Sequence, residues 1–365
     1  MAKVKDIVRH LESIAPPSLQ ESYDNASLIT GAQDWEVTGV LITLDCIESV
    51  VDEAIAQECN LIVAHHPIVF RGLKQLNGKN YVERTVIKAL KHDIAIYAIH
   101  TNLDNVHTGV NRKIAEKLGL QNLKILSPKK GTLQKLVTFI PVEDTEEVME
   151  AVHKAGAGNI GNYSDCSFQI TGKGFFRPND AADPLIGEAG HLEVVEENRV
   201  EVVYPGHLQG PVLSTLKQVH PYDEVAYYIT TLENSNQEVG SGMIGELPIP
   251  MTTNEFLYFL KDRMELNTIR YTEKTEPTVK KVAVCGGAGS FLLSKAKSRG
   301  ADAFVTADFK YHEFFDAEGK IMIADIGHYE SEIFTKDLLH AILTEKFPNI
   351  ASYLSRVDTN PVKYF

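Results

Sequence analysis

Two adjacent histidines, His65 and His66, follow the short apolar run Leu61–Ala64 and precede Pro67. A continuous apolar run of this length that ends at a breaker is typical of a buried strand. Open α/β sheets bind ligands at the carboxyl ends of such strands. Because consecutive residues of an extended chain point to opposite sides, the pair predicts one imidazole for each of two neighbouring metal ions. A buried, hydrogen-bonded histidine beside a loop-capping one is the alternative interpretation.

The strands predicted beside this run also end in carboxylates. The stretch 37–44 is a strand that ends at Asp45, and a helix connects it to 61–64 in a β-α-β unit. Such a unit places its two strands in parallel, as neighbours in one sheet. The next apolar strand, 93–100, leads into Asp104. We therefore expect Asp104 one loop away from the histidine pair.

A third group follows the predicted strand 320–326. His328 and Glu332 are four residues apart, so they project from one face of a helix that begins near Tyr329. The alternative is a loop histidine and a glutamate favoured by the helix dipole. His65, His66, Asp104, His328 and Glu332 all follow apolar strands, and we expect one crevice of one sheet to gather them. This ligand set suffices for two divalent ions with open coordination positions.

Imidazole and carboxylate ligands suit Zn, Fe, Mn, Co or Ni, and of these we favour Zn or Fe. The four cysteines, Cys46, Cys59, Cys166 and Cys285, are scattered and predict neither a disulfide framework nor a Cys-rich zinc site. A metal pair lowers the pKa of water and can clamp both oxygens of a displacement. The candidates for proton transfer or for support of the ligands are Tyr329, Glu330, His100, His312 and Asp45.

Two glycine-rich stretches and one turn carry weaker signals. Gly240–Gly245 matches GxGxxG, but Glu246–Pro250 follows it and is not a helix, so we interpret the stretch as a linker and not as a dinucleotide site. Gly286–Ser290 follows a strand, and its glycines either hold an anion at the next helix or only permit a tight turn. Asn25 is either a site residue or part of a side-chain-stabilised turn.

The 365 residues are enough for two or three domains. From about Ser127 the pattern changes to β-α-β followed by β-α-β with half-exposed strands, which is typical of an α+β ferredoxin-like sandwich. We predict this domain at 128–240, inserted between the two halves, 1–127 and 241–365, of an α/β domain in which helices flank the sheets.

The composition limits the partners. The formal net charge of −13, without a long basic run, disfavours nucleic acid and anionic membranes. No apolar stretch reaches the length of a membrane span, and the N-terminus lacks the apolar core of a signal peptide. We therefore expect a cytoplasmic protein whose partner is a small-molecule substrate or ligand.

The chain resembles the NIF three-like family, whose members are called GTP cyclohydrolase 1 type 2 homologues. The matching motifs are Asp24–Asn25, Leu61–Pro67, His100–Asp104, Gly109–Asn111, Thr306–His312 and Gly327–Glu332. The resemblance implies two metal ions per subunit held by the same five residues, with Glu332 as the bridge. It also implies a toroidal homohexamer and an insert similar to PII-like and divalent-cation-tolerance proteins. The stretch Asp24–Gly31 departs from the Asn-Val-Gly-Leu that is usual in the family.

Three functions compete on these residues. The first is a metal-dependent hydrolase of a small nucleotide-like or phosphorylated substrate, for which opening of the GTP imidazole ring is one example. The second is a non-enzymatic protein that handles metal, or that senses or assembles through the inserted domain. The third is a scaffold in which the metals only hold the fold.

Overall fold

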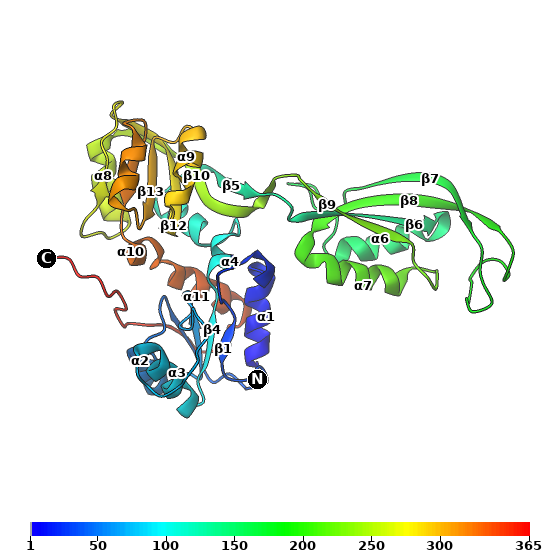
Figure 1. Ribbon diagram of the computed structural model, residues 1–365, viewed down its shortest axis with the longest axis horizontal. Helices are drawn as coiled ribbons and strands as arrows, with labels where there is room; N and C mark the ends of the chain where they lie inside the picture. The colour runs from blue at the N-terminus through cyan, green and yellow to red at the C-terminus, as the bar shows by residue number, and fades with distance from the viewer. Residues whose placement is uncertain (1) are drawn as a thin grey trace. The chain divides into compact units, whose positions relative to one another are not determined.

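The computed structural model describes residues 2–365 and divides into two compact units (Figure 1). Unit 1 combines the N-terminal part of the chain up to Pro128 with Gln237–Phe365, and unit 2 is Lys129–Asn236. The chain leaves unit 1 through strand β5 (Gln121–Lys129) and re-enters it through strand β10 (Asn236–Thr252), and these strands are neighbours in one sheet. Within residues 2–365, no helix is long and apolar enough to cross a membrane.

The first sheet of unit 1 has the strand order β1-β4-β3-β2-β15. Its strands are β1 (Leu28–Thr30), β2 (Val40–Thr43), β3 (Leu61–Ala64), β4 (Ala95–Ala98) and β15 (Ser352–Leu354). The central strands β2, β3 and β4 are parallel and buried along their whole length, as their unbroken apolar runs require. The helices around this sheet are α1 (Val4–Ile14), α2 (Glu48–Ala56), α3 (Tyr81–Lys91), α4 (Thr101–Asp104), α5 (Val110–Lys117) and α11 (Thr335–Lys346).

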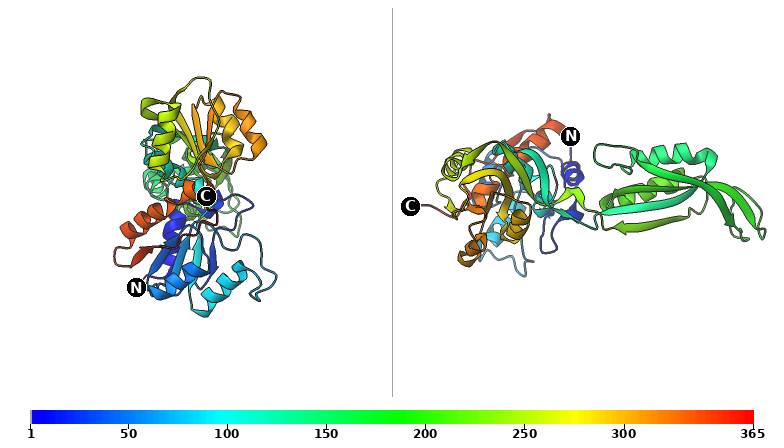
Figure 2. Two further views of the ribbon diagram at one scale, coloured as in Figure 1. Left: turned by 90° about the vertical axis from the view of Figure 1, so that its left-hand side faces the viewer. Right: turned by 90° about the horizontal axis from the view of Figure 1, so that it is seen from above.

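The second sheet of unit 1 has the order β11-β14-β13-β12-β10-β5. Its strands are β5 (Gln121–Lys129), β10 (Asn236–Thr252), β11 (Arg270–Tyr271), β12 (Thr278–Ala288), β13 (Ala303–Ala307) and β14 (Met322–Asp325). Helices α8 (Thr253–Arg263) and α9 (Leu293–Ser298) cover opposite faces of it (Figure 2, left view). The expectation of a single sheet for the ligands is therefore wrong, since strands that we placed in one sheet fall into two.

The GxGxxG stretch is a second correction, because Gly240–Gly245 is not a linker but part of strand β10. Its glycines let the neighbouring strand β5 approach closely. A Cβ on Gly240 would lie 2.3 Å from the backbone oxygen of Ser127, and one on Gly245 would lie 2.8 Å from that of Gln121. The spacing of these glycines therefore reflects the packing of two strands and not the binding of a dinucleotide.

Strand register brings the polar strand-end residues to common edges. In the first sheet Thr43 pairs with Ala64 and Ala64 with Ala98, so β2, β3 and β4 end level. Asp45 and His65 leave the sheet at this edge, as the β-α-β interpretation predicts. The carboxyl ends of parallel strands thus supply the site from the first sheet.

The second sheet supplies its share in the same way. Thr306 of β13 pairs with Asp325 of β14, so these two parallel strands also end level. Asp308 follows β13, and His328 opens the short helix α10 (His328–Glu332) after β14. Two groups of strand ends, one from each sheet of unit 1, therefore contribute to one site.

Unit 2 confirms the predicted ferredoxin-like domain. Its elements are β6 (Leu133–Pro141), α6 (Thr145–Lys154), β7 (Ser167–Phe176), β8 (Glu193–Pro205), α7 (Gln209–Val219) and β9 (Tyr227–Leu232). The sheet order is β7-β8-β6-β9 with every pair antiparallel. Both helices pack on one face of the sheet and enclose a separate apolar core. The opposite face has no helix.

Candidate metal centre

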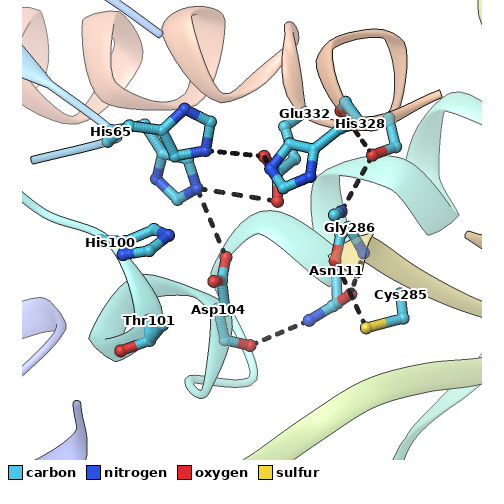
Figure 3. Close-up of polar contacts among 12 residues, drawn as sticks. His65, His100, Thr101, Asp104, Asn111, Cys285, Gly286, His328 and Glu332 are labelled. Carbon is cyan, nitrogen blue, oxygen red and sulfur yellow. Dashed lines mark hydrogen bonds and ion pairs between the residues drawn. The ribbon is translucent and has the colours of Figure 1, made fainter. Parts of the chain in front are cut away.

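The five predicted ligands lie together in unit 1 (Figure 3). His65, Asp104 and Glu332 form one group in which the possible ligand atoms are all within 4.8 Å of one another, and His66, His328 and Glu332 form another. Glu332 is common to both groups. Histidine and carboxylate donors that converge in this way could hold divalent metal ions.

Glu332 lies between the histidines. Its Oε2 is 2.9 Å from His66 Nε2 and 3.1 Å from His328 Nε2, and its Oε1 is 3.9 Å from His65 Nε2. The side chain is 3% exposed. Burial raises the pKa of this carboxyl, but the hydrogen bonds from His328 and His66 outweigh burial and hold the pKa well below its usual range. Glu332 is thus an anion that faces three imidazoles.

Each histidine of the cluster is fixed through its Nδ1 atom, which leaves Nε2 directed at the centre. The Nδ1 partners are Ile99 O for His65 (2.9 Å), Asp45 for His66 (2.8 Å), Asp24 for His100 (2.8 Å) and Asp308 for His328 (2.7 Å). Because carbonyl and carboxylate oxygens only accept, each Nδ1 donates. Metal-bound histidines in proteins are oriented by this same arrangement.

Two polar atoms of the cluster have no hydrogen-bond partner. They are His65 Nε2 and Asp104 Oδ1, which are buried and lie 3.6 Å apart. Burial lowers the pKa of His65 to about 3, so this ring is neutral and its Nε2 presents a lone pair. Burial and the nearby charge of Glu332 raise the pKa of Asp104 well above its usual value. Unsatisfied buried polar atoms are costly, and a cation between them would satisfy both.

We expected the two adjacent histidines to point to opposite sides, as in an extended chain, but they do not. Their ring centroids are 4.9 Å apart, and both rings face the cluster. The reason is that β3 ends at Ala64, so His65 and His66 lie in a bend beyond the strand where strict alternation no longer applies. The Asn25 side chain donates to Val69 O at 2.6 Å, so it links its loop to the segment after the histidine pair and does not close a local turn.

The glycines after β12 give Glu332 its space. Gly287 has φ +58°, and a Cβ there would lie 2.6 Å from Glu332 Oε1 and 3.1 Å from His328 Cε1. Asn111 connects this segment to helix α4, because its side chain donates to Asp104 O at 2.9 Å and accepts from Gly286 N at 3.0 Å. The Gly286–Gly287 pair therefore borders the carboxylate cluster.

The other candidates fall into three places. His100 belongs to the cluster, with its ring centroid 5.3 Å from that of His65. Tyr329 and Glu330 line a cavity of about 640 Å³ that also reaches His66 and His328. His312 lies away from the cluster on an exposed 3-10 helix, Tyr311–Ala317, where its ring contacts Tyr311 and Phe315.

Sequence reasoning missed the roles of Asp308 and Asp24. Asp308 is two residues beyond Thr306 in the Thr306–His312 motif, so its place after a buried strand was the available signal. Asp24 accepts from His100 Nδ1 and from Thr101 N, across about seventy-five residues of sequence that give no sign of this contact. Both aspartates orient histidines and do not face the centre themselves.

The chain is similar over almost its whole length to known proteins. It is 40% identical over 365 residues to the GTP cyclohydrolase 1 type 2 homolog of Bacillus subtilis (strain 168), covering 99% of this chain and 98% of that protein. It is 38% identical to the homolog of Halalkalibacterium halodurans, with 100% and 99% covered. The structure of a Bacillus cereus protein related to NIF3 superposes with a TM-score of 0.88 at 38% identity, with 100% and 99% covered. Residues 2–361 match Duf34/NIF3 (NGG1p interacting factor 3), and the chain belongs to this family.

Proposed function

We propose that this protein is a dinuclear metal-dependent hydrolase of a small nucleotide-like or phosphorylated substrate. The observation that carries the proposal is the pair of unsatisfied atoms, His65 Nε2 and Asp104 Oδ1, beside a buried Glu332 that faces histidines with both oxygens. Imidazoles anchored through Nδ1 and carboxylates are suitable ligands for divalent ions. The residues present therefore fit a metal pair.

The two donor groups divide the ligands. His65 and Asp104 would hold one ion, His66 and His328 would hold the other, and Glu332 would contribute to both. When bound, such ions supply Lewis acidity and make water a nucleophile near neutral pH. Zinc or iron suits this donor set, as do manganese, cobalt and nickel.

His100 is the best candidate for moving a proton. Asp24 accepts from its Nδ1 at 2.8 Å, so the ring is oriented and the proton on Nδ1 is fixed. Its other nitrogen faces the cluster, within 4.8 Å of ligand atoms of His65 and His66. A histidine that is held by a carboxylate and directed at the reacting centre is suited to general acid–base catalysis.

The cavity of about 640 Å³ beside the cluster has room for a nucleotide-sized molecule. Its wall includes Arg270, which pairs with Asp325 but whose side chain is 59% exposed. A partly exposed guanidinium suits a phosphate or carboxylate of a substrate. Tyr329 and Tyr364 also line it and could pack against a base. The name of the relatives makes GTP ring opening one reaction within this class.

The test is metal analysis of protein purified without chelators, followed by a screen of nucleotides and phosphoesters with the metal-loaded protein. We expect about two ions per chain and turnover of at least one compound. His65→Ala should lower both. Metal-loaded protein that leaves the whole panel unchanged would end the hydrolase proposal, and unchanged metal content in His65→Ala would end the site assignment.

A second function, regulation or sensing through the insert, is favoured by one observation. Unit 2 has its own apolar core and its own cavity of about 420 Å³. A variant in which a short glycine linker replaces residues 130–235 tests it, since this cut leaves strands β5 and β10 whole. Full metal content and full turnover without the insert would make the insert regulatory or structural. Loss of turnover with retained metal would make it part of the enzyme.

A further inference from the structure

Unit 2 contains a cavity that the metal chemistry does not use. It has a volume of about 420 Å³ and lies on the face of the sheet that carries no helix. Its wall is built from the segment 174–186, the segment 222–226 and residues of β6, β8 and β9. Phe139, Phe176, Tyr222 and Tyr228 supply aromatic rings to it. A concave site with aromatic walls is suited to a small organic molecule.

Glu197 of β8 is the polar group at the base of this cavity. It is only 8% exposed. No lysine, arginine or histidine within residues 2–365 forms an ion pair with it, whereas Glu201 on the same face of β8 pairs with Lys135 and Arg199. Gly174 makes room for its carboxylate, because a Cβ there would lie 2.0 Å from Glu197 Oε2. A carboxylate buried without a cation is costly unless a ligand supplies one.

Tyr222 is held beside this carboxylate by the His220-Pro-Tyr-Asp-Glu224 segment. The Tyr222 N–H donates to His220 Nδ1 at 3.1 Å, and His220 Nε2 donates to Phe139 O at 3.0 Å. The two rings are in contact, with centroids 5.2 Å apart. The buried Tyr222 hydroxyl lies beside the Glu197 carboxylate, and burial together with this carboxylate raises the pKa of the hydroxyl. The cavity therefore presents a buried carboxylate whose close neighbour is a neutral hydroxyl and not a cation.

The charges of the wall identify the chemical class of the ligand. Asp183, Glu197, Asp223 and Glu224 are acidic, and Arg177, which donates to Gly190 O at 3.0 Å, is the basic residue. A bare metal ion fits poorly, because the groups of three close donors found within residues 2–365 all belong to the cluster in unit 1. An ammonium group on a hydrocarbon body fits both parts of the wall, since carboxylates pair with the cation and aromatic rings attract it through their faces.

We propose that unit 2 is a binding site for an organic ammonium ion, with the cation on Glu197 and the hydrocarbon body against Phe176, Tyr222 and Tyr228. Both aryl and alkyl amines share this chemistry. This inference does not depend on the metal centre or on the hydrolase proposal, because every residue that it uses lies in Lys129–Asn236.

The experiment is calorimetric titration of the full-length protein with phenethylamine and, separately, with spermidine, while 2-phenylethanol serves as the neutral analogue. We expect at least one amine to bind and the alcohol to bind more weakly. Glu197→Gln should weaken amine binding more than about tenfold, because it removes a buried charge partner. Glu196→Gln is the matched control, since this neighbouring side chain is exposed, and it should bind as the wild type does.

Tyr222→Leu gives a second test that leaves the carboxylate in place. It should also weaken amine binding, and circular dichroism would verify that each variant is folded. The proposal is overturned if neither amine binds, if 2-phenylethanol binds as tightly as phenethylamine, or if binding is the same in Glu197→Gln as in Glu196→Gln. Binding of phenethylamine alone or of spermidine alone would support the proposal and identify the hydrocarbon body as aryl or alkyl.

Discussion

His65 Nε2 and Asp104 Oδ1 lie 3.6 Å apart, and both atoms are buried without a hydrogen-bond partner. This separation is longer than a hydrogen bond, which spans about 2.7–3.2 Å. Two ligands bound tetrahedrally to one zinc ion, each at about 2.1 Å, lie roughly 3.4 Å apart. The separation is therefore close to that of two ligand atoms on one metal ion, and it is too long for a direct hydrogen bond.

Asp104→Asn should have opposite effects with and without metal. In chelated protein the buried carboxylate near Glu332 is destabilising, as its raised pKa indicates, so the amide should leave the melting temperature unchanged or higher. In metal-loaded protein the same change removes a ligand and should lower the melting temperature. We expect metal affinity to fall by more than the roughly 10- to 100-fold that is typical of residues around the ligands. Scanning calorimetry with and without chelator measures both effects.

The control for this variant is Asp34→Asn, because Asp34 is 74% exposed and pairs only with lysines on the surface. It should behave as the wild type does in both conditions. Equal destabilisation of Asp104→Asn in chelated and in metal-loaded protein would show that Asp104 supports the fold and does not bind an ion.

Metal binding should release protons. Without metal, burial lowers the pKa of His66, but the hydrogen bonds to Asp45 and Glu332 outweigh it and raise the pKa to about 9. The same balance, with Asp308 and Glu332 as partners, raises the pKa of His328 to about 11. Both rings are therefore protonated at neutral pH, and an ion at their Nε2 atoms must displace those protons.

Calorimetry in buffers with different ionisation enthalpies counts these protons. We expect about two to be released per chain at neutral pH, and about one in His328→Ala. A binding enthalpy that does not depend on the buffer would contradict the assignment of both histidines as ligands.

The Asp24 carboxylate should stabilise the fold in a pH-dependent way. Burial raises its pKa, but hydrogen bonds from His100 and Thr101 outweigh burial and lower the pKa from 3.8 to about 2. Because the folded-state pKa is depressed, the stabilisation is complete above the usual value and is lost as the pH falls through about 2. Asp24→Asn should therefore cost on the order of 2 kcal/mol at neutral pH, and less in acid.

Urea unfolding at neutral pH, and at a pH between the usual pKa of 3.8 and the folded-state pKa of about 2, measures how the cost of Asp24→Asn changes with pH. Asp52→Asn is the control, since this exposed aspartate pairs with Lys88 and should contribute less than about 1 kcal/mol. A cost of Asp24→Asn that stays constant or grows in acid would contradict the depressed pKa.

The ligand cluster could be predicted from the sequence because each ligand follows a recognisable apolar strand. Two examples are the apolar run Leu61–Ala64 and the run Met322–Asp325, which is apolar up to its last residue. The residues after each run must leave the sheet at its edge. The ferredoxin-like insert could be predicted equally well, since apolar and polar residues alternate along its strands and its helices have apolar stripes. Local patterns thus determine where strands end, and strand ends position the cluster.

The division into two sheets could not be predicted, because it depends on which strands pair. Strand β15, Ser352–Leu354, joins the first sheet beside β2 from the far end of the chain. Strand β10 contains Gly240 and Gly245, whose purpose appears only when β5 is beside it. The role of Asp24 could not be predicted for the same reason, since its contact with His100 joins segments that no local pattern connects. Asp308 differs, because its place after a buried strand was a signal that sequence reasoning did not use.

Gly287→Ala should disrupt the candidate metal centre by steric crowding of Glu332, in addition to any backbone strain. A Cβ at Gly287 would lie 2.6 Å from Glu332 Oε1, so the carboxylate must move away from the histidines. Gly119→Ala is the matched control, because Gly119 has a similar φ of +61°, against +58° for Gly287, and nothing lies within 4 Å of its Cβ position. Both variants should lose about 1–2 kcal/mol of stability from the left-handed backbone. Metal content, measured by elemental analysis, should fall only in Gly287→Ala, and an equal fall in both would mean that the glycine serves the fold and not the site.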